Sequence, residues 1–458
     1  MNHARITELI QQTAGALVAD GDQLTHDFYA HLFGAHPELG HTFNMANQGR
    51  GFQARSLFEA IVLFVTKYDA FETLGAEAWR IAAKHVSVDV RPDQYALVGA
   101  SLLAVIRERL GAAATPDVMQ AWELAYGRIA GVLTGVEAGM YAAQVALPGG
   151  WAGFRPFVVQ RIVAEAADVQ SFYLVPADGQ ALPAYAPGQF ITLAVTLPDH
   201  PYRQLRQYSL SDAPGRPYLR LTVKCEARTA QAPAPLVSPY LHEQVAVGTT
   251  LNLRAPAGEF CLDPDATRPL VLLAGGLGIT PFMAMLEHLA RTGSPRRVLL
   301  VHAVRDPAHQ PFGRRVRQLA RQHPALRCFA LYQFAPVGPT NEDEGCPLDY
   351  GSGFLRPDHL DYLLTPDLDG AEFYCCGPAG FRHHVGALLA HRGEAACRFE
   401  AFVPAHELSP MSPPEGCPAH ASVLAHASVL AHAPVLAHAP VLAHAPVLAA
   451  AGRCPFGH

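Results

Sequence analysis

One histidine of this chain, His85, is a candidate for a chemical role. His85 lies on the inner face of a predicted amphipathic helix in the stretch IAAKHVSVDVRPDQY, residues 81–95. A histidine beside apolar residues is more often a hydrogen-bonded core or surface group than a ligand. This stretch alone therefore favours a structural role for His85. Whether His85 is a ligand depends on the motifs in the rest of the chain.

A glycine-rich turn and a second strand end form the next group. In VLLAGGLGITPFMAML a predicted strand runs into glycines and then into a helix, an arrangement in which backbone N–H groups can meet a pyrophosphate. In FYCCGPAGF a strand ends at the carboxyl edge of the same predicted sheet, where such sheets bind ligands. The residues predicted to bind a nucleotide at this edge are Gly275, Gly276, Leu277, Gly278, Ile279, Thr280, Pro281, Cys376, Gly377 and Pro378.

A third group lies upstream, in the short predicted strand RQYSLS, residues 206–211. Arg206 offers a charge for a phosphate, Tyr208 a ring face for a planar heterocycle, and Ser209 a hydroxyl for a polar edge atom. An ordinary exposed strand would look the same. The motif gains weight because it precedes the predicted nucleotide-binding sheet.

The elements that must position these groups change character along the chain. Residues 1–148 show apolar residues at helical spacing throughout, which predicts an all-α domain with helix N-caps at Asp93 and Thr115 and Pro116 in a first turn. Residues 152–263 carry short β-type runs between Pro/Gly turns, which predicts an antiparallel β-barrel. In residues 267–405 strands alternate with helices, which predicts an α/β domain with a parallel sheet.

Residues 406–458 form a predicted low-complexity tail. The hexad HA(S/P)VLA occurs five times from His420, and such short Ala/His/Pro repeats are expected to be extended and disordered. The spaced histidines could bind a metal, although a neutral repeat expansion is the favoured interpretation. Cys417-Pro418 and Cys454-Pro455 also resemble Cys-Pro haem-regulatory dipeptides, a minor alternative.

Composition narrows the class of protein. The net charge is −6, and no basic run with interleaved aromatic residues occurs, so neither nucleic acid nor an anionic membrane is an indicated partner. Apolar stretches stay short of the roughly 18 residues that a membrane span needs, so no stable membrane insertion is expected. All nine cysteines lie from Cys225 onward without a CxxC pattern, which disfavours a secreted disulfide framework. We expect a soluble, cytoplasmic monomer that binds small molecules.

Taken in order, RQYSLS, GGLGITP and CCGP resemble the ferredoxin reductase family, and the chain through about residue 405 resembles the bacterial flavohemoglobins. This resemblance implies a globin that binds haem b, an FAD-binding barrel and an NAD(P)H-binding domain. Matching stretches include DFYAHLF, TFNMANQ, GFQARSLF, KH, PDQY and GVEAGMY. With them, His85 is identified as the proximal ligand of the haem iron.

The resemblance also implies roles for the other matching residues of the globin. Glu137 and Tyr95 would increase electron donation from His85 to the iron. Tyr29, assisted by Gln53, would hydrogen-bond the oxygen bound on the opposite face. Phe43 and Leu57 would shape an apolar distal pocket, although they could equally be ordinary core residues. Lys84 and Glu400 would tune the redox potentials where the domains meet.

In the reductase half, the resemblance implies that the FAD-binding residues are Tyr185, Arg206, Gln207, Tyr208, Ser209, Ser238, Ala401, Phe402, Val403 and Pro404. Phe402 would cover the flavin and leave when nicotinamide enters. Two departures from the family pattern affect this set. TAQAPAPLVSPYLH replaces a glycine pair near the FAD phosphates, and Val403 replaces a common glycine.

The implied function is that of a nitric oxide dioxygenase, which uses electrons from NAD(P)H, passed through FAD to haem, to convert NO and O2 to nitrate and so protects against nitrosative stress. Reduction of alkyl or lipid hydroperoxides at the same haem is an alternative. A haem-based gas sensor or carrier is less well supported, because a complete reductase has little use in a passive binder. NADH and NADPH are not distinguished, since Arg305, Arg314 and Arg315 could approach a 2′-phosphate but also suit a surface helix.

Overall fold

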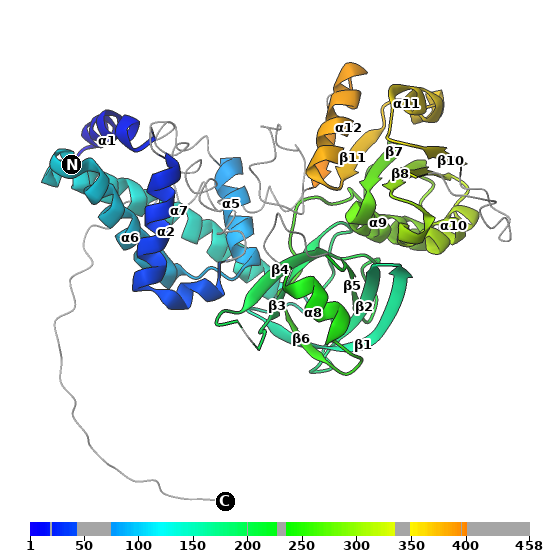
Figure 1. The fold of residues 1–458 in the computed structure, drawn as a ribbon, viewed down its shortest axis with the longest axis horizontal. Helices are drawn as coiled ribbons and strands as arrows, with labels where there is room; N and C mark the ends of the chain where they lie inside the picture. The colour runs from blue at the N-terminus through cyan, green and yellow to red at the C-terminus, as the bar shows by residue number, and fades with distance from the viewer. Residues whose placement is uncertain are drawn as a thin grey trace, which may run out of the picture.

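The computed structural model describes residues 1–18, 21–43, 75–198, 200–226, 235–334, 349–394 and 396–400. Figure 1 shows three folded parts in chain order: a helical part, a strand-rich part and a part in which strands alternate with helices. The predicted fold class is thereby confirmed for these three parts. The predicted tail and the site residues Gln53, Leu57, Ala401, Phe402, Val403 and Pro404 lie outside the described residues.

The helical part packs around a large apolar core and a smaller apolar cluster between α5 and α7. Side chains such as Ile10, Leu32 and Ile106 are almost completely buried there. Its elements are α1 (His3–Val18), α2 (Gly21–Ala35), η1 (Pro37–His41), α5 (Gly75–Ser87), α6 (Pro92–Leu110), η3 (Gly111–Ala113) and α7 (Pro116–Ala146). Helix α7 packs against α1, α5 and α6, so it is the central helix of this part.

Two helix starts test the predicted N-caps. Thr115 caps α7 as predicted, because its hydroxyl accepts a hydrogen bond of 3.3 Å from the main-chain N–H three residues later, and Pro116 follows. The predicted cap at Asp93 is wrong, since α6 begins at Pro92 and Arg91 is its cap residue. Proline lacks an N–H and has a fixed φ, which suit the first helical position and move Asp93 into the first turn.

By length and composition alone, α7 is also long and apolar enough to cross a membrane. Its buried residues include Trp122, Leu133 and Glu137, and the indole N–H of Trp122 donates to the Thr13 hydroxyl at 3.0 Å. One such helix is weak evidence for a membrane span.

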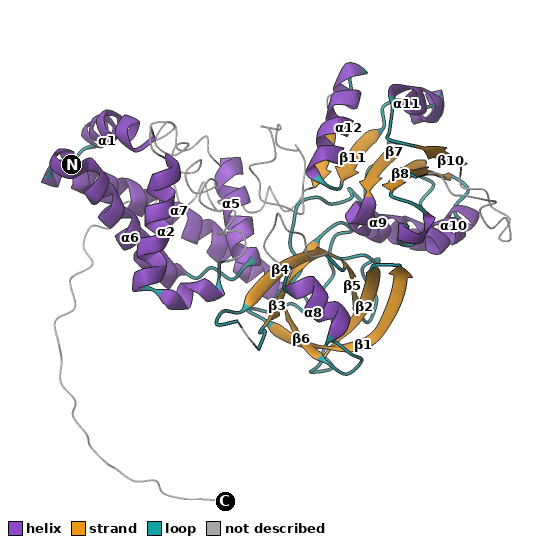
Figure 2. Cartoon of the chain, viewed as in Figure 1, coloured by secondary structure: helices purple, strands orange, loops and turns teal. Residues whose placement is uncertain are grey.

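The strand-rich part is an antiparallel sheet of order β4-β3-β6-β1-β2-β5. An isolated bridge between Leu210 and Leu221 joins its two edges, which closes the sheet into the predicted barrel (Figure 2). Its elements are β1 (Arg155–Ala166), β2 (Val169–Pro176), β3 (Phe190–Val195), β4 (Gln204–Ser209), β5 (Leu219–Lys224), α8 (Val237–Glu243) and β6 (Thr250–Leu253). Helix α8 was not predicted.

The third part is a parallel sheet of order β10-β9-β8-β7-β11-β12. The chain moves from β7 to one edge and then returns to build the other side with β11 and β12. The carboxyl ends of β7 and β11 therefore flank the position where strand order reverses, at which such sheets bind ligands. Buried Leu and Val side chains cover both faces of the central strand β7.

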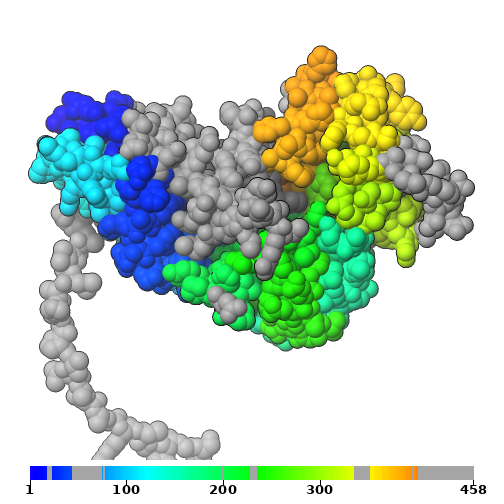
Figure 3. All heavy atoms as spheres, in the orientation of Figure 1, coloured from blue at the N-terminus to red at the C-terminus, as the bar shows by residue number. Residues whose placement is uncertain are grey.

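The elements of this part are β7 (Leu270–Gly275), η4 (Gly276–Gly278), α9 (Ile279–Thr292), β8 (Val298–Val304), η5 (Pro307–His309), α10 (Gly313–Gln322), β9 (Leu326–Tyr332), β10 (Asp349–Ser352), α11 (Pro357–Leu363), η7 (Pro366–Leu368), β11 (Glu372–Cys376), α12 (Ala379–His391) and β12 (Cys397–Glu400). Strands β10 and β12 and helix α11 were not predicted. The space-filling view shows this part resting on the barrel (Figure 3).

Candidate functional site

His85 is the centre of a hydrogen-bonded group that three helices assemble. It lies in the last turn of α5, Tyr95 on α6 and Glu137 on α7. The Nδ1 atom of His85 is 2.8 Å from Glu137 Oε1 and 2.9 Å from the Tyr95 hydroxyl oxygen. The Tyr95 hydroxyl donates to the same carboxylate oxygen at 2.5 Å. The three residues that sequence reasoning grouped are therefore in direct contact.

Burial strengthens the interactions of this group. Glu137 is 1% exposed, and burial together with the Glu137 carboxylate raises the pKa of Tyr95, so its hydroxyl remains a donor at neutral pH. A carboxylate that accepts the Nδ1–H bond fixes the tautomer in which Nε2 of His85 carries a lone pair.

The residues fit a haem ligand set. The side chain of His85 is 32% exposed, and its hydrogen bonds within the described part of the chain all use Nδ1. Nε2 therefore remains as the ring nitrogen that could bind iron. His85 would hold the metal, and Glu137 and Tyr95 would orient the ring.

Tyr29 and Phe43 lie together within the helical part. The ring of Tyr29 stacks on Phe33 at a centroid distance of 5.7 Å and meets Phe43 edge-on at 5.9 Å. Tyr29 is 9% exposed, and burial raises its pKa above the ordinary value. The structure thus brings together two of the four residues predicted for the distal pocket. The other two, Gln53 and Leu57, lie outside the described residues.

Strand β4 directs its side chains to two sides of the barrel. Arg206 and Tyr208 alternate with Gln207, so they share one face of the strand, and both are half-buried. This arrangement fits a cofactor with a phosphate and a flat ring. Burial raises the pKa of Tyr208, and Arg206 partly opposes that shift.

Gln207 faces the helical part instead. Its side-chain N–H donates to the Ser87 hydroxyl at 2.7 Å, and its side-chain oxygen accepts from the Lys84 ammonium. Lys84 is exposed to solvent at the end of α5. Partial desolvation by neighbouring residues lowers the pKa of its ammonium, and the Glu400 carboxylate opposes the shift. The Glu400 carboxylate is therefore near enough to Lys84 to affect its pKa, and the redox-tuning role of this pair stays a prediction.

The other predicted FAD residues of the barrel are engaged in backbone contacts. Ser209 is buried and pairs with Phe190 of β3. Ser238 is buried at the start of α8, and its hydroxyl accepts from the N–H of Glu226 at 3.2 Å. Contact of these residues with FAD stays a prediction.

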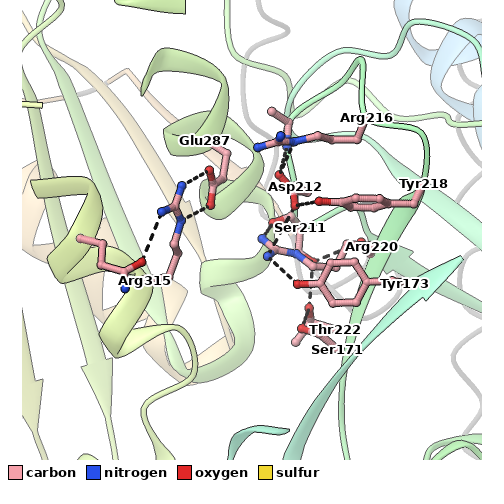
Figure 4. Close-up of polar contacts among 12 residues, drawn as sticks. Ser171, Tyr173, Ser211, Asp212, Arg216, Tyr218, Arg220, Thr222, Glu287 and Arg315 are labelled. Atoms are coloured by element: carbon pink, nitrogen blue, oxygen red, sulfur yellow. Dashed lines mark hydrogen bonds and ion pairs between the residues drawn. The ribbon is translucent and has the colours of Figure 1, made fainter. Parts of the chain in front are cut away.

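Tyr185 joins a buried polar network at the boundary between the barrel and the α/β part, and Figure 4 shows Asp212 and Arg220 of this network. Its hydroxyl donates to the Asp212 carbonyl oxygen at 2.8 Å. The Asp212 carboxylate lies 3.6 Å from the guanidinium of Arg220, which is buried in the barrel and covers the ring of Phe312 at 5.0 Å. Phe312 precedes α10, so Arg220 connects the two parts.

Two of the arginines considered for a 2′-phosphate are held by carboxylates in the structure. Arg315 forms two hydrogen bonds of 2.6 and 2.7 Å with the buried Glu287 of α9 (Figure 4). Arg305 donates to Asp306 at 3.2 Å. Arg314 is exposed. The choice between NADH and NADPH stays open.

The predicted NAD(P)-binding residues meet at the edge where β7 and β11 end. A Cβ atom on Gly278 would lie 2.1 Å from the Cys376 carbonyl oxygen, and one on Gly377 would lie 2.9 Å from Gly275 Cα. These close backbone approaches explain why both positions require glycine. Thr280 and Pro281 are buried in the first turn of α9, so the turn leads into a helix as predicted.

Gly278→Ala is expected to raise the KM for NADH at least about tenfold, because backbone atoms of β11 must shift to admit the new methyl group and the nucleotide is predicted to bind at the same edge. Steady-state reduction of an artificial acceptor by NADH measures this change. Gly380→Ala is the matched control, since nothing lies within 4 Å of its Cβ position in α12. Equal KM values for the two variants would contradict the prediction.

His302 supports the same turn from the neighbouring strand β8. Its Nε2–H donates to the Gly276 carbonyl oxygen at 2.8 Å, and the side chain is 2% exposed. Burial lowers the pKa of His302 to about 4. The folded protein therefore holds this histidine neutral.

His302 is expected to make the protein less stable in mild acid. In the unfolded chain it takes up a proton as pH falls through about 6.5, whereas in the folded protein it stays neutral until about pH 4. Between pH 7 and pH 5 the free energy of unfolding should therefore fall by about 2 kcal/mol more in the wild type than in His302→Gln. Urea denaturation at both pH values measures this. An equal loss of unfolding free energy in the two proteins would contradict this prediction. His26→Gln, at an exposed position of α2, is the control.

Sequence reasoning missed several residues around these sites. Tyr141 lies one helical turn after Glu137, and its hydroxyl donates to the Val90 carbonyl oxygen at 2.6 Å. Its helical spacing from Glu137 was a usable signal. Arg254 and His302 carried no such signal, because their partners are distant in sequence.

Comparisons with known proteins agree with this architecture. Residues 26–133 match the family described as Globin, and residues 272–386 match the family described as Oxidoreductase NAD-binding domain. A crystal structure of flavohemoglobin from Malassezia yamatoensis, with bound FAD and heme, matches with a TM-score of 0.70 and 24% identity over 87% of this chain and 99% of that one. This match shows a shared fold.

Sequence relatives give the family. The flavohemoprotein of Deinococcus radiodurans is 43% identical over 405 residues, which cover 88% of this chain and 97% of that protein. The flavohemoprotein of Bordetella pertussis is 40% identical over 399 residues, which cover 87% of this chain and 97% of that protein. The resemblance noted from the sequence is thereby confirmed: the chain belongs to the flavohemoprotein family and is a flavohaem oxidoreductase.

Proposed function

We propose that this protein is a nitric oxide dioxygenase that oxidises NO with O2 to nitrate and so removes NO under nitrosative stress. Haem b, FAD and NADH or NADPH would be its cofactors. Two facts support this set: the fold is that of the Malassezia protein that contains FAD and heme, and residues 272–386 match an NAD-binding family. Operation in the cytoplasm, as a monomer without a nucleic-acid or membrane partner, stays a prediction.

The hydrogen-bonded group of His85, Tyr95 and Glu137 is the observation that carries the proposal. A buried carboxylate that accepts the Nδ1–H bond gives the imidazole anionic character and makes it a stronger electron donor to iron. A protein that only stores or senses oxygen has no need of this donation. The attached reductase parts point in the same direction.

The bound cofactors would supply hydride acceptance, single-electron transfer and gas binding. The chain itself would do the rest. Tyr29, with Gln53, would donate hydrogen bonds into the gas-binding pocket, and Phe43 with Leu57 would keep that pocket apolar. Lys84 and Glu400 would set the local charge between haem and flavin.

In the reductase parts, Arg206 would neutralise the FAD phosphates and Tyr208 would lie along the flavin ring. Tyr185, Ser209 and Ser238 would complete the barrel side of this site, and Ala401, Phe402, Val403 and Pro404 the other side. The side chain of Gln207, also predicted to bind FAD, contacts Lys84 and Ser87 of the helical part instead. The glycine-rich turn at residues 275–278 and the strand end at Cys376–Pro378 would hold the nucleotide of NAD(P)H.

The decisive experiment is NO consumption by the purified protein loaded with haem and FAD, with NADH and oxygen present and nitrate quantified. Rapid turnover with one nitrate formed per NO consumed is expected. If NADH reduces the haem but NO yields no nitrate, the dioxygenase proposal fails. Alkyl hydroperoxides are then the substrates to test, whereas gas binding without NADH-driven reduction would indicate a sensor or carrier.

A further inference from the structure

Arg254 is the largest side chain that is almost completely buried in the described part of the chain. It follows the last strand of the barrel, and its N–H donates to the Thr192 carbonyl oxygen at 2.9 Å, which fixes its backbone in the barrel. Its side chain, 1% exposed, leaves the barrel and enters the helical part. A buried arginine is costly unless it is paired, so its partners are informative.

Those partners lie in the turn that directly follows His85. The guanidinium donates to the Val86 carbonyl oxygen at 3.0 Å and to the Asp89 carboxylate at 2.7 Å. The guanidinium carbon of Arg254 also lies over the ring of Tyr141, 5.3 Å from the ring centroid. One side chain of the barrel thus contacts the end of α5 at two points.

This turn has a conformation that needs support. Asp89 has φ of 68°, in the left-handed region that favours glycine. The backbone folds back here, because the N–H groups of Val88 and Val90 both donate to the His85 carbonyl oxygen at 3.1 Å. Any movement of the turn therefore acts directly on the backbone of His85.

The side chain of His85 and the turn after it are held separately. Glu137 of α7 holds the imidazole, and Tyr141, one helical turn further, holds the Val90 carbonyl oxygen. Both of these residues belong to the helical part. Arg254 is different, because it ties the same turn to the barrel, in which FAD would be bound.

We propose that Arg254 is a positioning residue that, through Asp89 and the Val86 carbonyl, fixes the turn after His85 against the barrel. Loss of this contact would loosen the turn, whereas Gln207 of β4 would still tie Lys84 and Ser87 at the end of α5 to the barrel. The consequence for electron transfer from flavin to haem rests on the proposed function; the consequence for the turn itself does not.

The test uses the full chain loaded with haem and FAD. Arg254→Met removes the charge and both hydrogen bonds while keeping a side chain of similar length. Asp89→Asn removes only the ion pair. Arg107→Met, on an exposed position of α6, is the matched control. Arg254→Lys keeps the charge but has no fork to reach both acceptors, so it should rescue only part of the effect.

Hydrogen exchange of the amides in residues 86–91 is the first readout. We expect exchange at least about tenfold faster in Arg254→Met, a smaller increase in Asp89→Asn, and no change in β1 and β2 of the barrel. The second readout separates two steps in a single turnover with NADH. Flavin reduction should stay within about twofold, and the following one-electron reduction of ferric haem should slow about tenfold or more.

The outcomes separate this proposal from the proposed function. Unchanged exchange at residues 86–91 in both Arg254→Met and Asp89→Asn would overturn the positioning role. Should Arg254→Met fail to fold, the exchange rates of Asp89→Asn alone decide whether the role stands. A wild-type protein that forms no nitrate from NO would refute the dioxygenase proposal and leave the exchange and haem-reduction results valid.

Discussion

Glu137→Gln is expected to slow the conversion of NO to nitrate by about 10- to 100-fold, the range typical when a group that orients a metal ligand is removed. Glutamine has nearly the same shape, so the packing of α7 should be kept. The change removes the negative charge that faces His85 Nδ1 at 2.8 Å. In the wild type the buried Glu137 Oε2 atom has no hydrogen-bond partner among the described residues. The substitution also introduces an amide N–H at this position.

A spectroscopic measurement distinguishes this effect from simple misfolding. The stretching frequency of the bond between ferrous iron and imidazole should fall in Glu137→Gln, because a neutral partner gives the ring less anionic character. Glu123→Gln, an exposed position on the same helix, should leave both the frequency and nitrate formation unchanged. An unchanged frequency in Glu137→Gln would show that the carboxylate does not tune His85.

The main-chain architecture followed from local patterns. Apolar periodicity located the helices that carry His85, Tyr95 and Glu137, and the Thr115-Pro116 signature marked the start of α7 because a hydroxyl cap and a first-turn proline are local chemistry. The glycines near 275–278 were readable for the same reason, since only glycine allows such close backbone approach.

Short elements and contacts between residues distant in the chain could not be predicted from the sequence. Helix α8 has seven residues, too few to show a period, and it depends on Val237 and Leu241 packing into the barrel core. The contact between Arg254 and Asp89 joins residues 165 positions apart, which no local pattern encodes. The direction of the Gln207 side chain could not be predicted for the same reason, because its partners Lys84 and Ser87 lie in the helical part.

Tyr29→Phe is expected to lower kcat for NO conversion by about 100-fold, the usual loss when one preorganised hydrogen-bond donor is removed from a reaction site. The Tyr29 ring is held by Phe28, Phe33 and Phe43, contacts that phenylalanine keeps, so the fold should be retained. Reduction of the flavin by NADH occurs in other parts of the chain and should stay within about twofold. Tyr362→Phe, exposed on α11, is the matched control.

The pH dependence identifies the hydroxyl as the cause. Burial raises the pKa of Tyr29 above its ordinary value, so its hydroxyl keeps its proton throughout the range from pH 6 to 9. The loss caused by Tyr29→Phe should therefore be the same at every pH in this range. A loss that disappears toward pH 9 would mean that the tyrosine acts through a titrating group elsewhere. Wild-type rates in the variant would remove Tyr29 from the mechanism and leave Gln53 as the candidate donor.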